Sequence, residues 1–298
     1  MALTRSPLIA TEDPRLEQLA DIEALAVDLA QEAGKAIVAA LGRTLTIRYK
    51  ELGTDKLAKA IKAGGLWKDP VSEVDQAVEG MIREKVAEKY PGHDILGEEV
   101  DTALLHDSDF VWAIDPIDGT ANFINGFPLF AASIGVLYRG EPVVGALWCS
   151  ASHALYAGVY HARLGGELCF DGKPLQLEIN PAIKRRLAGS PHVGTSTDFP
   201  WDTRQTGSAA IECAFVAAGL MRVARFERPN TWDVAGGLAL LRAAGAEILC
   251  GGPAGWQPFT HFEATPGQSG PPLLRNWRRP LIIGDIAGIG LMSAQYPA

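Results

Sequence analysis

The sequence predicts an α/β protein of the α+β layered type, on the strength of three observations. Apolar side chains recur at helical spacing through residues 14–41. Between residues 94 and 170 the repeat changes to two residues, as in strands with one buried face. The second half of the chain then alternates helical and strand patterns. Because helices and sheets bury their apolar faces against each other, we expect a layered sandwich.

The N-terminal helix is predicted to begin at Asp13-Pro14, an N-cap followed by proline at the first helical position. Gly42 is predicted to end it. Its buried stripe should consist of Leu16, Leu19, Ile22, Leu25, Ala26, Leu29, Ala33, Ile37 and Leu41. A second helix is predicted from Ser72, a favourable N-cap, to just before Pro91.

Residues 43–70 are expected to form a mobile basic loop. They combine several glycines with Lys50, Lys56, Lys59, Lys62 and Lys68. The stretch is interpreted either as a solvated surface or as a flap over an anion site.

Short strands are predicted over residues 94–96, 110–114, 131–138, 143–149, 154–159 and 166–170. Asp171-Gly172 is a hairpin signal. Later elements are helices over 208–218 and 232–244, strands over 246–250 and 281–284, and a loop rich in Gly and Pro over 251–272. We expect a single catalytic domain over residues 1–298, with a division into two fused lobes (about 14–180 and 181–298) as the alternative.

The charge balance argues against some function classes. With 27 basic and 35 acidic residues the net charge is −8, which is unfavourable for binding a nucleic-acid backbone. The N-terminus lacks a signal-peptide pattern, and no run reaches the roughly 18 apolar residues of a membrane span. The cysteines have no metal-ligand spacing and are expected to be free thiols: Cys149, Cys169, Cys213 and Cys250. We therefore expect a cytoplasmic protein without a nucleic-acid or membrane partner.

The most informative segment is Trp112–Phe123, where an apolar strand runs into two aspartates and a Gly-Thr pair. The carboxylates of Asp115 and Asp118 and the carbonyl of Ile117 are hard oxygen ligands of the kind that Mg²⁺ or Mn²⁺ prefers. A helix beginning at Gly119-Thr120 would point its positive end at an anion. The alternative is an ordinary turn, since Asp-Pro and Asp-Gly are common turn dipeptides.

Two further acidic positions follow the same pattern. Glu98 comes directly after a predicted strand, and Asp233 lies at the start of a predicted helix. Taken singly, Glu98 is a surface acid and Asp233 an N-cap. If they join Asp115 and Asp118, the like charges require cations to neutralise them, which is the physical reason for postulating metal ions.

These segments resemble, in the same order, the motifs of the inositol monophosphatase family. The motifs are Asp69-x-Val71-Ser72-x-x-Asp75, Gly97-Glu98-Glu99, Asp115–Thr120 with Asn122-Phe123, and Trp232–Gly236. The resemblance covers about Asp69 to Leu281. It implies an alternating α-β-α-β-α sandwich, a magnesium-dependent and often lithium-sensitive phosphatase, and a homodimer.

The resemblance also implies metal ligands. Two or three Mg²⁺ ions per chain are expected, with Mn²⁺ able to substitute. The first would bind Glu98, Asp115 and the Ile117 carbonyl, and the second Asp115, Asp118 and Asp233. Asp75 would help to hold a third metal or its waters.

Catalytic and substrate-binding roles follow from the same resemblance. Glu98 and Thr120 would orient a metal-bound water, with Asp75 beside them, and the amides of Gly119 and Thr120 would bind phosphate. The alcohol part of the substrate would contact Asp118, Ala209, Glu227 and Asp233. The spacing from Glu227 to Asp233 departs from the inositol-specific pattern, and Arg225 and Arg228 in that segment could favour a more anionic substrate.

The resemblance and the motifs together predict a Mg²⁺-dependent phosphomonoesterase. The first expected substrate is myo-inositol monophosphate. Histidinol phosphate, fructose 1,6-bisphosphate and the 3'-phosphate of adenosine bisphosphates are the alternatives. A metal-dependent binding protein of the same fold is the non-enzymatic alternative.

Overall fold

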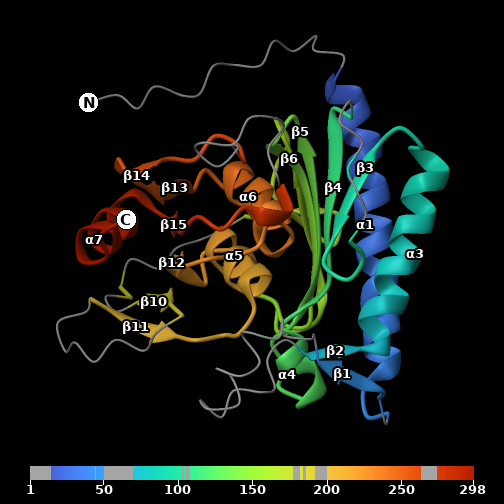
Figure 1. Ribbon diagram of the computed structural model, residues 1–298. Coiled ribbons are helices and arrows are strands. Elements are labelled where there is room, and N and C mark those ends of the chain that lie inside the picture. The colour runs from blue at the N-terminus through green and yellow to red at the C-terminus, as the bar shows by residue number, and fades with distance from the viewer. Residues whose placement is uncertain are drawn as a thin grey trace, which may run out of the picture.

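The computed structural model describes residues 15–43, 45–49, 70–101, 104, 108–176, 182–183, 186–191, 200–262 and 274–298. Helices and sheets alternate in five layers, as predicted (Figure 1). In order they are α1 with α3, a seven-stranded sheet, α5 with α6, a six-stranded sheet, and α7. No helix in these described ranges has both the length and the apolar character that a membrane crossing requires.

The first layer consists of α1 (Arg15–Ala40) and α3 (Glu73–Lys89), which cover one face of the seven-stranded sheet. The predicted stripe of α1 is buried at Leu19, Ile22, Ala26, Leu29, Ala33 and Ile37. Leu41 was wrongly included, because the helix ends at Ala40 and the Leu41 side chain is 44% exposed. Gly42 follows with φ +75°, a conformation that favours glycine.

The basic loop falls mostly outside the described residues, which include none of its five lysines. Part of it is ordered as a strand, so the expectation of a loop is wrong for Ile47–Tyr49 (β1). β1 pairs antiparallel with Pro70–Ser72 (β2), directly before α3. This pairing sets where α3 begins.

The seven-stranded sheet has the order β3-β4-β5-β6-β7-β8-β9, and its first pair is parallel. Its strands are Asp94–Gly97 (β3), Phe110–Asp118 (β4), Ala131–Tyr138 (β5), Glu141–Cys149 (β6), Gly158–Arg163 (β7), Cys169–Phe170 (β8) and Lys173–Pro174 (β9). The predicted strand over 154–159 is wrong over 154–157, because residues 153–156 form a turn with Leu155 at φ +63° and β7 begins only at Gly158. Asp171 and Gly172, at φ +47° and +77°, form the predicted hairpin turn.

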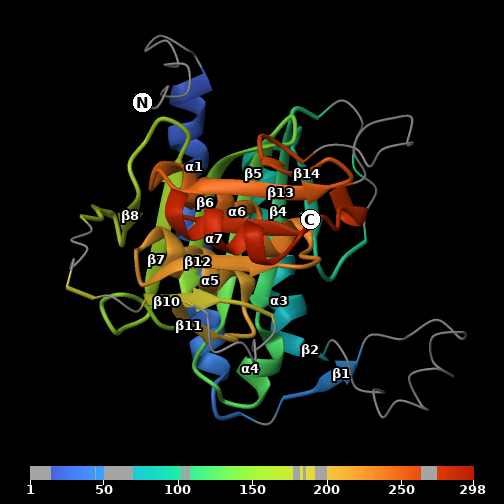
Figure 2. The ribbon, with the colours of Figure 1, turned by 90° about the vertical axis from the view of Figure 1, so that its left-hand side faces the viewer.

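The six-stranded sheet has the order β11-β10-β12-β15-β13-β14. Its strands are Arg186–Gly189 (β10), Trp201–Arg204 (β11), Met221–Phe226 (β12), Glu247–Gly252 (β13), Gly255–Pro258 (β14) and Leu281–Gly284 (β15). The predicted loop over 251–272 is wrong at β14, because Gly252 and Gly255 close a tight hairpin back onto β13. The C-terminal helix α7 (Ile286–Gln295) was not predicted; it lies across the outer face of this sheet (Figure 2).

The middle layer consists of α5 (Ala209–Ala217) and α6 (Thr231–Ala243). Helix α6 packs directly on the backbone of β5 and β6 at three glycines. A Cβ at Gly135 would lie 2.4 Å from Gly236 N, and one at Gly145 would lie 2.1 Å from Gly236 O. Glycine at these positions therefore lets α6, which carries Asp233, approach the sheet closely.

Gly145→Ala is expected to destabilise the protein by about 2 kcal/mol, because the added methyl group forces α6 away from the sheet. Urea denaturation measures the change. Gly80→Ala is the matched control: it lies on the exposed face of α3 with nothing within 4 Å of its Cβ position. That substitution should stabilise by about 0.5–1 kcal/mol. Equal effects at both positions would contradict the close packing.

Candidate active site

Strand β4 carries the paired aspartates at its C-terminal end. Every residue from Phe110 to Asp118 is buried, and the strand runs beyond its predicted end at Ile114. Its register with β5 shifts between Asp115 and Asp118. Asp115 Oδ1 accepts a hydrogen bond from the Ile117 amide at 3.1 Å. This local irregularity aims two carboxylates into the interior at one strand end.

Gly119 makes the turn from β4 into the short helix α4 (Thr120–Ile124). Its φ of +89° is left-handed, which only glycine adopts without strain. A Cβ there would lie 3.1 Å from the Leu129 carbonyl oxygen. The Thr120 hydroxyl lies 2.9 Å from the Ile117 carbonyl oxygen and 3.2 Å from Asp75 Oδ1. The turn therefore brings Thr120 beside an acid of α3.

Asp75 belongs to the N-terminal capping box of α3. Its Oδ2 accepts the Ser72 amide at 2.8 Å and the Ser72 hydroxyl at 2.5 Å. Burial raises its pKa, and the nearby charge of Glu98 adds to the rise. Asp75, Thr120 and Glu98 are therefore neighbours, although they come from a helix, a turn and a strand end.

Asp115 lies at the centre of the acidic cluster, which we define as Glu98, Asp115, Asp118 and Asp233. It is 2% exposed. Burial, followed by the charges of Glu98, Asp118 and Asp233, raises its pKa well above the ordinary value, and the side chain is hydrogen-bonded to Glu98. The structure thus brings together four acids that come from three separate segments of the sequence.

Asp118 joins β4 to the start of α5. Its Oδ2 accepts the Ser208 hydroxyl at 2.5 Å and the Ala210 amide at 2.6 Å. The Ala209 amide also contacts this carboxylate. Burial raises the pKa of Asp118 to about 6, although these hydrogen bonds lower it. Ala209 therefore borders the cluster, and Ser208, the N-cap of α5, contacts Asp118 directly.

Asp233 is the third residue of α6 and not its N-cap. The N-cap is Asn230, whose amide donates to Asp233 Oδ2 at 2.8 Å. Burial raises the pKa of Asp233 to about 8, and the charge of Asp118 adds to the rise. The helix thus begins at Thr231, one residue earlier than predicted, and directs Asp233 at the β4 strand end.

Glu227 and Arg225 have other contacts. Arg225 Nη1 lies 3.0 Å from Glu227 Oε1, and its guanidinium lies 4.4 Å from the centre of the Tyr296 ring. Val223, which lies two residues before Arg225 on the same face of β12, packs in a separate hydrophobic cluster beneath α7. Arg225 thus faces the α7 layer, so the suggestion that it favours an anionic substrate is not supported.

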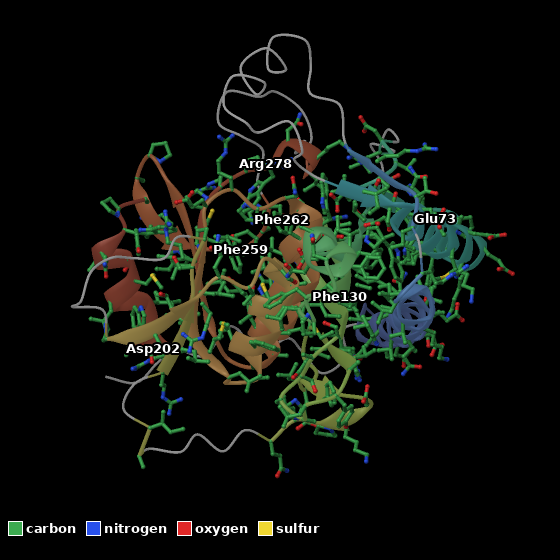
Figure 3. The ribbon with its side chains drawn as sticks, turned by 90° about the horizontal axis from the view of Figure 1, so that it is seen from below. Glu73, Phe130, Asp202, Phe259, Phe262 and Arg278 are labelled. Carbon is green, nitrogen blue, oxygen red and sulfur yellow. The ribbon has the colours of Figure 1, made fainter. Side chains whose placement is uncertain are left out.

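Two arginines that were not among the predicted site residues lie next to the acidic cluster. The guanidiniums of Arg275 and Arg278 lie 5.2 and 5.7 Å from the centre of the Trp232 ring system, one residue before Asp233. Burial lowers the pKa of Arg278, whereas the charge of Asp233 raises it. In Figure 3 Arg278 lies on the same side of the molecule as Phe262. Asp202, which belongs to the edge strand β11, lies away from both.

The donor set fits hard divalent cations. It offers buried carboxylates, the Ile117 carbonyl and the Thr120 hydroxyl, all of them oxygen donors. Within the described ranges, no three His, Cys, Asp or Glu side chains are already arranged as a ligand group. Because burial and mutual repulsion raise the pKa values of Asp115, Asp118 and Asp233, metal binding at these carboxylates would be coupled to proton release.

Comparison of the sequence with known proteins identifies the family to which the chain belongs. Residues 18–265 match the sequence profile described as the inositol monophosphatase family. The chain belongs to the inositol monophosphatase family. Its relatives include the chloroplastic phosphatase IMPL1 of Arabidopsis thaliana, 31% identical over 74% of this chain and 60% of that protein. Another is the fructose-1,6-bisphosphatase/inositol-1-monophosphatase of Aquifex aeolicus, 33% identical over 63% of this chain and 75% of that protein.

The fold is similar to that of solved structures in the family. The extragenic suppressor protein suhB from Bartonella henselae superposes with a TM-score of 0.68 at 22% identity. The superposition covers 92% of this chain and 97% of that one. At this identity the likeness concerns the layered fold.

Proposed function

We propose that the protein is a Mg²⁺-dependent phosphomonoesterase acting on a small phosphorylated alcohol, with myo-inositol monophosphate as first candidate. The observation that carries the proposal is the convergence of Glu98 and Asp233, both partly buried, with the buried Asp115 and Asp118 in one cluster. Such crowding of like charges is unfavourable without cations. Family membership supports the reaction class, and the relatives' names support the substrate.

In the proposed mechanism the acidic cluster and the Ile117 carbonyl hold the metals. Bound Mg²⁺ supplies charge neutralisation for the phosphate and lowers the pKa of coordinated water. Glu98 and Thr120 orient the attacking water, and Asp75 holds the Thr120 hydroxyl. The Gly119 and Thr120 amides, at the start of α4, bind the phosphate.

The alcohol part of the substrate is proposed to lie near Asp118, Ala209 and Asp233. Glu227 stays in this proposal because it lies between β12 and α6 in the chain, although its ion pair with Arg225 competes with substrate. A bisphosphate is the second candidate substrate. Arg278 lies near Asp233 with Arg228 in its surroundings, and the Aquifex relative is named for both activities.

We also propose that the layers form one catalytic domain, since α5 packs against strands of both sheets. We further propose that the protein is a cytoplasmic homodimer and is sensitive to lithium. It is proposed to use two or three Mg²⁺ ions and to accept Mn²⁺ in their place.

Metal removal tests the function. Phosphate release should fall to background in excess EDTA and return with Mg²⁺ or Mn²⁺. A panel of inositol, histidinol and adenosine phosphates and fructose 1,6-bisphosphate, compared by kcat/KM, identifies the substrate. Metal binding without hydrolysis of any of them would favour the binding-protein alternative.

A further inference from the structure

The turn that carries Glu98 is held by a buried acid of α3. Glu79 is fully buried, and its Oε2 accepts the Glu99 amide at 2.7 Å while its Oε1 accepts the Val100 amide at 3.1 Å. Arg83 Nε donates to the same Oε1 at 2.7 Å. These donors compensate the buried carboxylate, so Glu79 contacts the backbone of the turn and not the acidic cluster.

The fit between Glu79 and the turn leaves no spare room. A Cβ at Gly97 would lie 2.1 Å from Glu79 Oε1. Gly97 therefore allows the carboxylate to lie directly against the backbone that precedes Glu98. The turn is thus fixed from the α3 side.

The turn is also held by Arg275, which shares the Val100 carbonyl with Arg83 of α3. Its Nη2 donates to the Gly97 carbonyl at 2.7 Å and to the Val100 carbonyl at 3.0 Å. Its Nε lies 2.8 Å from Asp101 Oδ1. The guanidinium also lies 5.2 Å from the centre of the Trp232 ring system. Arg275 thus contacts the residue before Glu98 and the residue before Asp233 at once.

We propose that Arg275 and Glu79 are positioning residues that hold the Glu98 carboxylate at a set distance from Asp233. The inference rests on the proposed function, in which both acids bind Mg²⁺. Fixing the backbone on either side of a ligand reduces the reorganisation needed when the metal enters. Residues that orient metal ligands in this way typically change metal affinity by about 10–100-fold when replaced.

Arg275→Gln tests the proposal, because it removes the charge and the paired donors from a side chain that is 24% exposed. We expect Mg²⁺ affinity, measured by titration calorimetry on the full chain, to fall about tenfold or more. Arg275→Lys keeps the charge and should recover part of the loss. At saturating Mg²⁺ the KM for substrate should stay within about twofold of wild type, because Arg275 does not touch the substrate in this scheme.

Arg279→Gln is the matched control. Arg279 is close in sequence but donates to the Gly251 carbonyl of β13 at 3.0 Å. It should leave Mg²⁺ affinity unchanged. Glu79→Gln provides a second test from the α3 side and should also weaken Mg²⁺ binding.

Each outcome has a distinct meaning. Wild-type Mg²⁺ affinity in Arg275→Gln, in a chain whose parent binds Mg²⁺ and hydrolyses phosphomonoesters, would overturn the positioning role alone. An equal loss in Arg279→Gln would also overturn it. A parent protein that neither binds Mg²⁺ nor hydrolyses any phosphomonoester would overturn the proposed function and this inference with it.

Discussion

Asp115→Asn should lower kcat about a thousandfold or more and at the same time make the metal-free protein more stable. Asp115 lies at the centre of the acidic cluster and is the proposed ligand of two metals. Loss of metal-based charge stabilisation worth about 4 kcal/mol corresponds to about three powers of ten in rate. Without metal, however, its burial and its acidic neighbours oppose ionisation. An uncharged amide removes that repulsion.

The measurement compares phosphate release at saturating Mg²⁺ with urea denaturation in EDTA. Asp109→Asn is the control, because Asp109 lies just before the same strand but forms an exposed ion pair with Arg139 at 2.7 Å. Solvent screens such an exposed pair and leaves it with little net effect on stability, so both readouts should change little. Retained turnover in Asp115→Asn, or a destabilised metal-free variant, would contradict the assignment.

The second large effect is a loss of stability of the metal-free protein as pH rises. Burial raises the pKa of Glu212 to about 7, and those of Asp118 and Asp233 to about 6 and about 8. At pH values between the unfolded-state and folded-state pKa values of these carboxyl groups, the folded protein binds more protons than the unfolded protein. The free energy of unfolding must therefore fall with increasing pH, from about pH 4 to about pH 8.

Glu212 alone should contribute about 3 kcal/mol of this decrease, given its shift from 4.5 to about 7. Burial lowers the pKa values of His93 and His153. Below about pH 6.5 these two groups therefore make the free energy of unfolding rise with pH, which opposes the decrease. Urea denaturation in EDTA at several pH values measures the sum. Glu212→Gln should flatten the profile.

Mg²⁺ provides the complementary test. Metal binding needs ionised carboxylates, so Mg²⁺ should stabilise the protein more at pH 8 than at pH 5. A metal-free stability that rises from pH 5 to 8 would contradict the protonated cluster.

Local sequence signals were sufficient for the longest elements. The apolar spacing of α1 and the Ser72 cap of α3 correctly predicted two long helices, because capping and amphipathic burial act over a few residues. Strand β12 was missed because Arg222 and Arg225 interrupt its apolar pattern. These arginines are accommodated by Asp285 and Tyr296, which lie more than sixty positions along the chain.

The sequence by itself determined the chemistry available to this protein: the oxygen donors, their order along the chain, and the helices and strands that carry most of them. Only the tertiary structure decided that Glu98 and Asp233 meet Asp115 and Asp118, that Arg225 faces the α7 layer, and that Arg275 contacts the Glu98 turn. The position of Asp233 depends on the packing of α6 against glycines of the sheet, and the other contacts join residues far apart in the chain. Burial disfavours an ionised carboxylate unless a cation neutralises it. The burial of these carboxylates is set by the tertiary packing and not by neighbours in sequence.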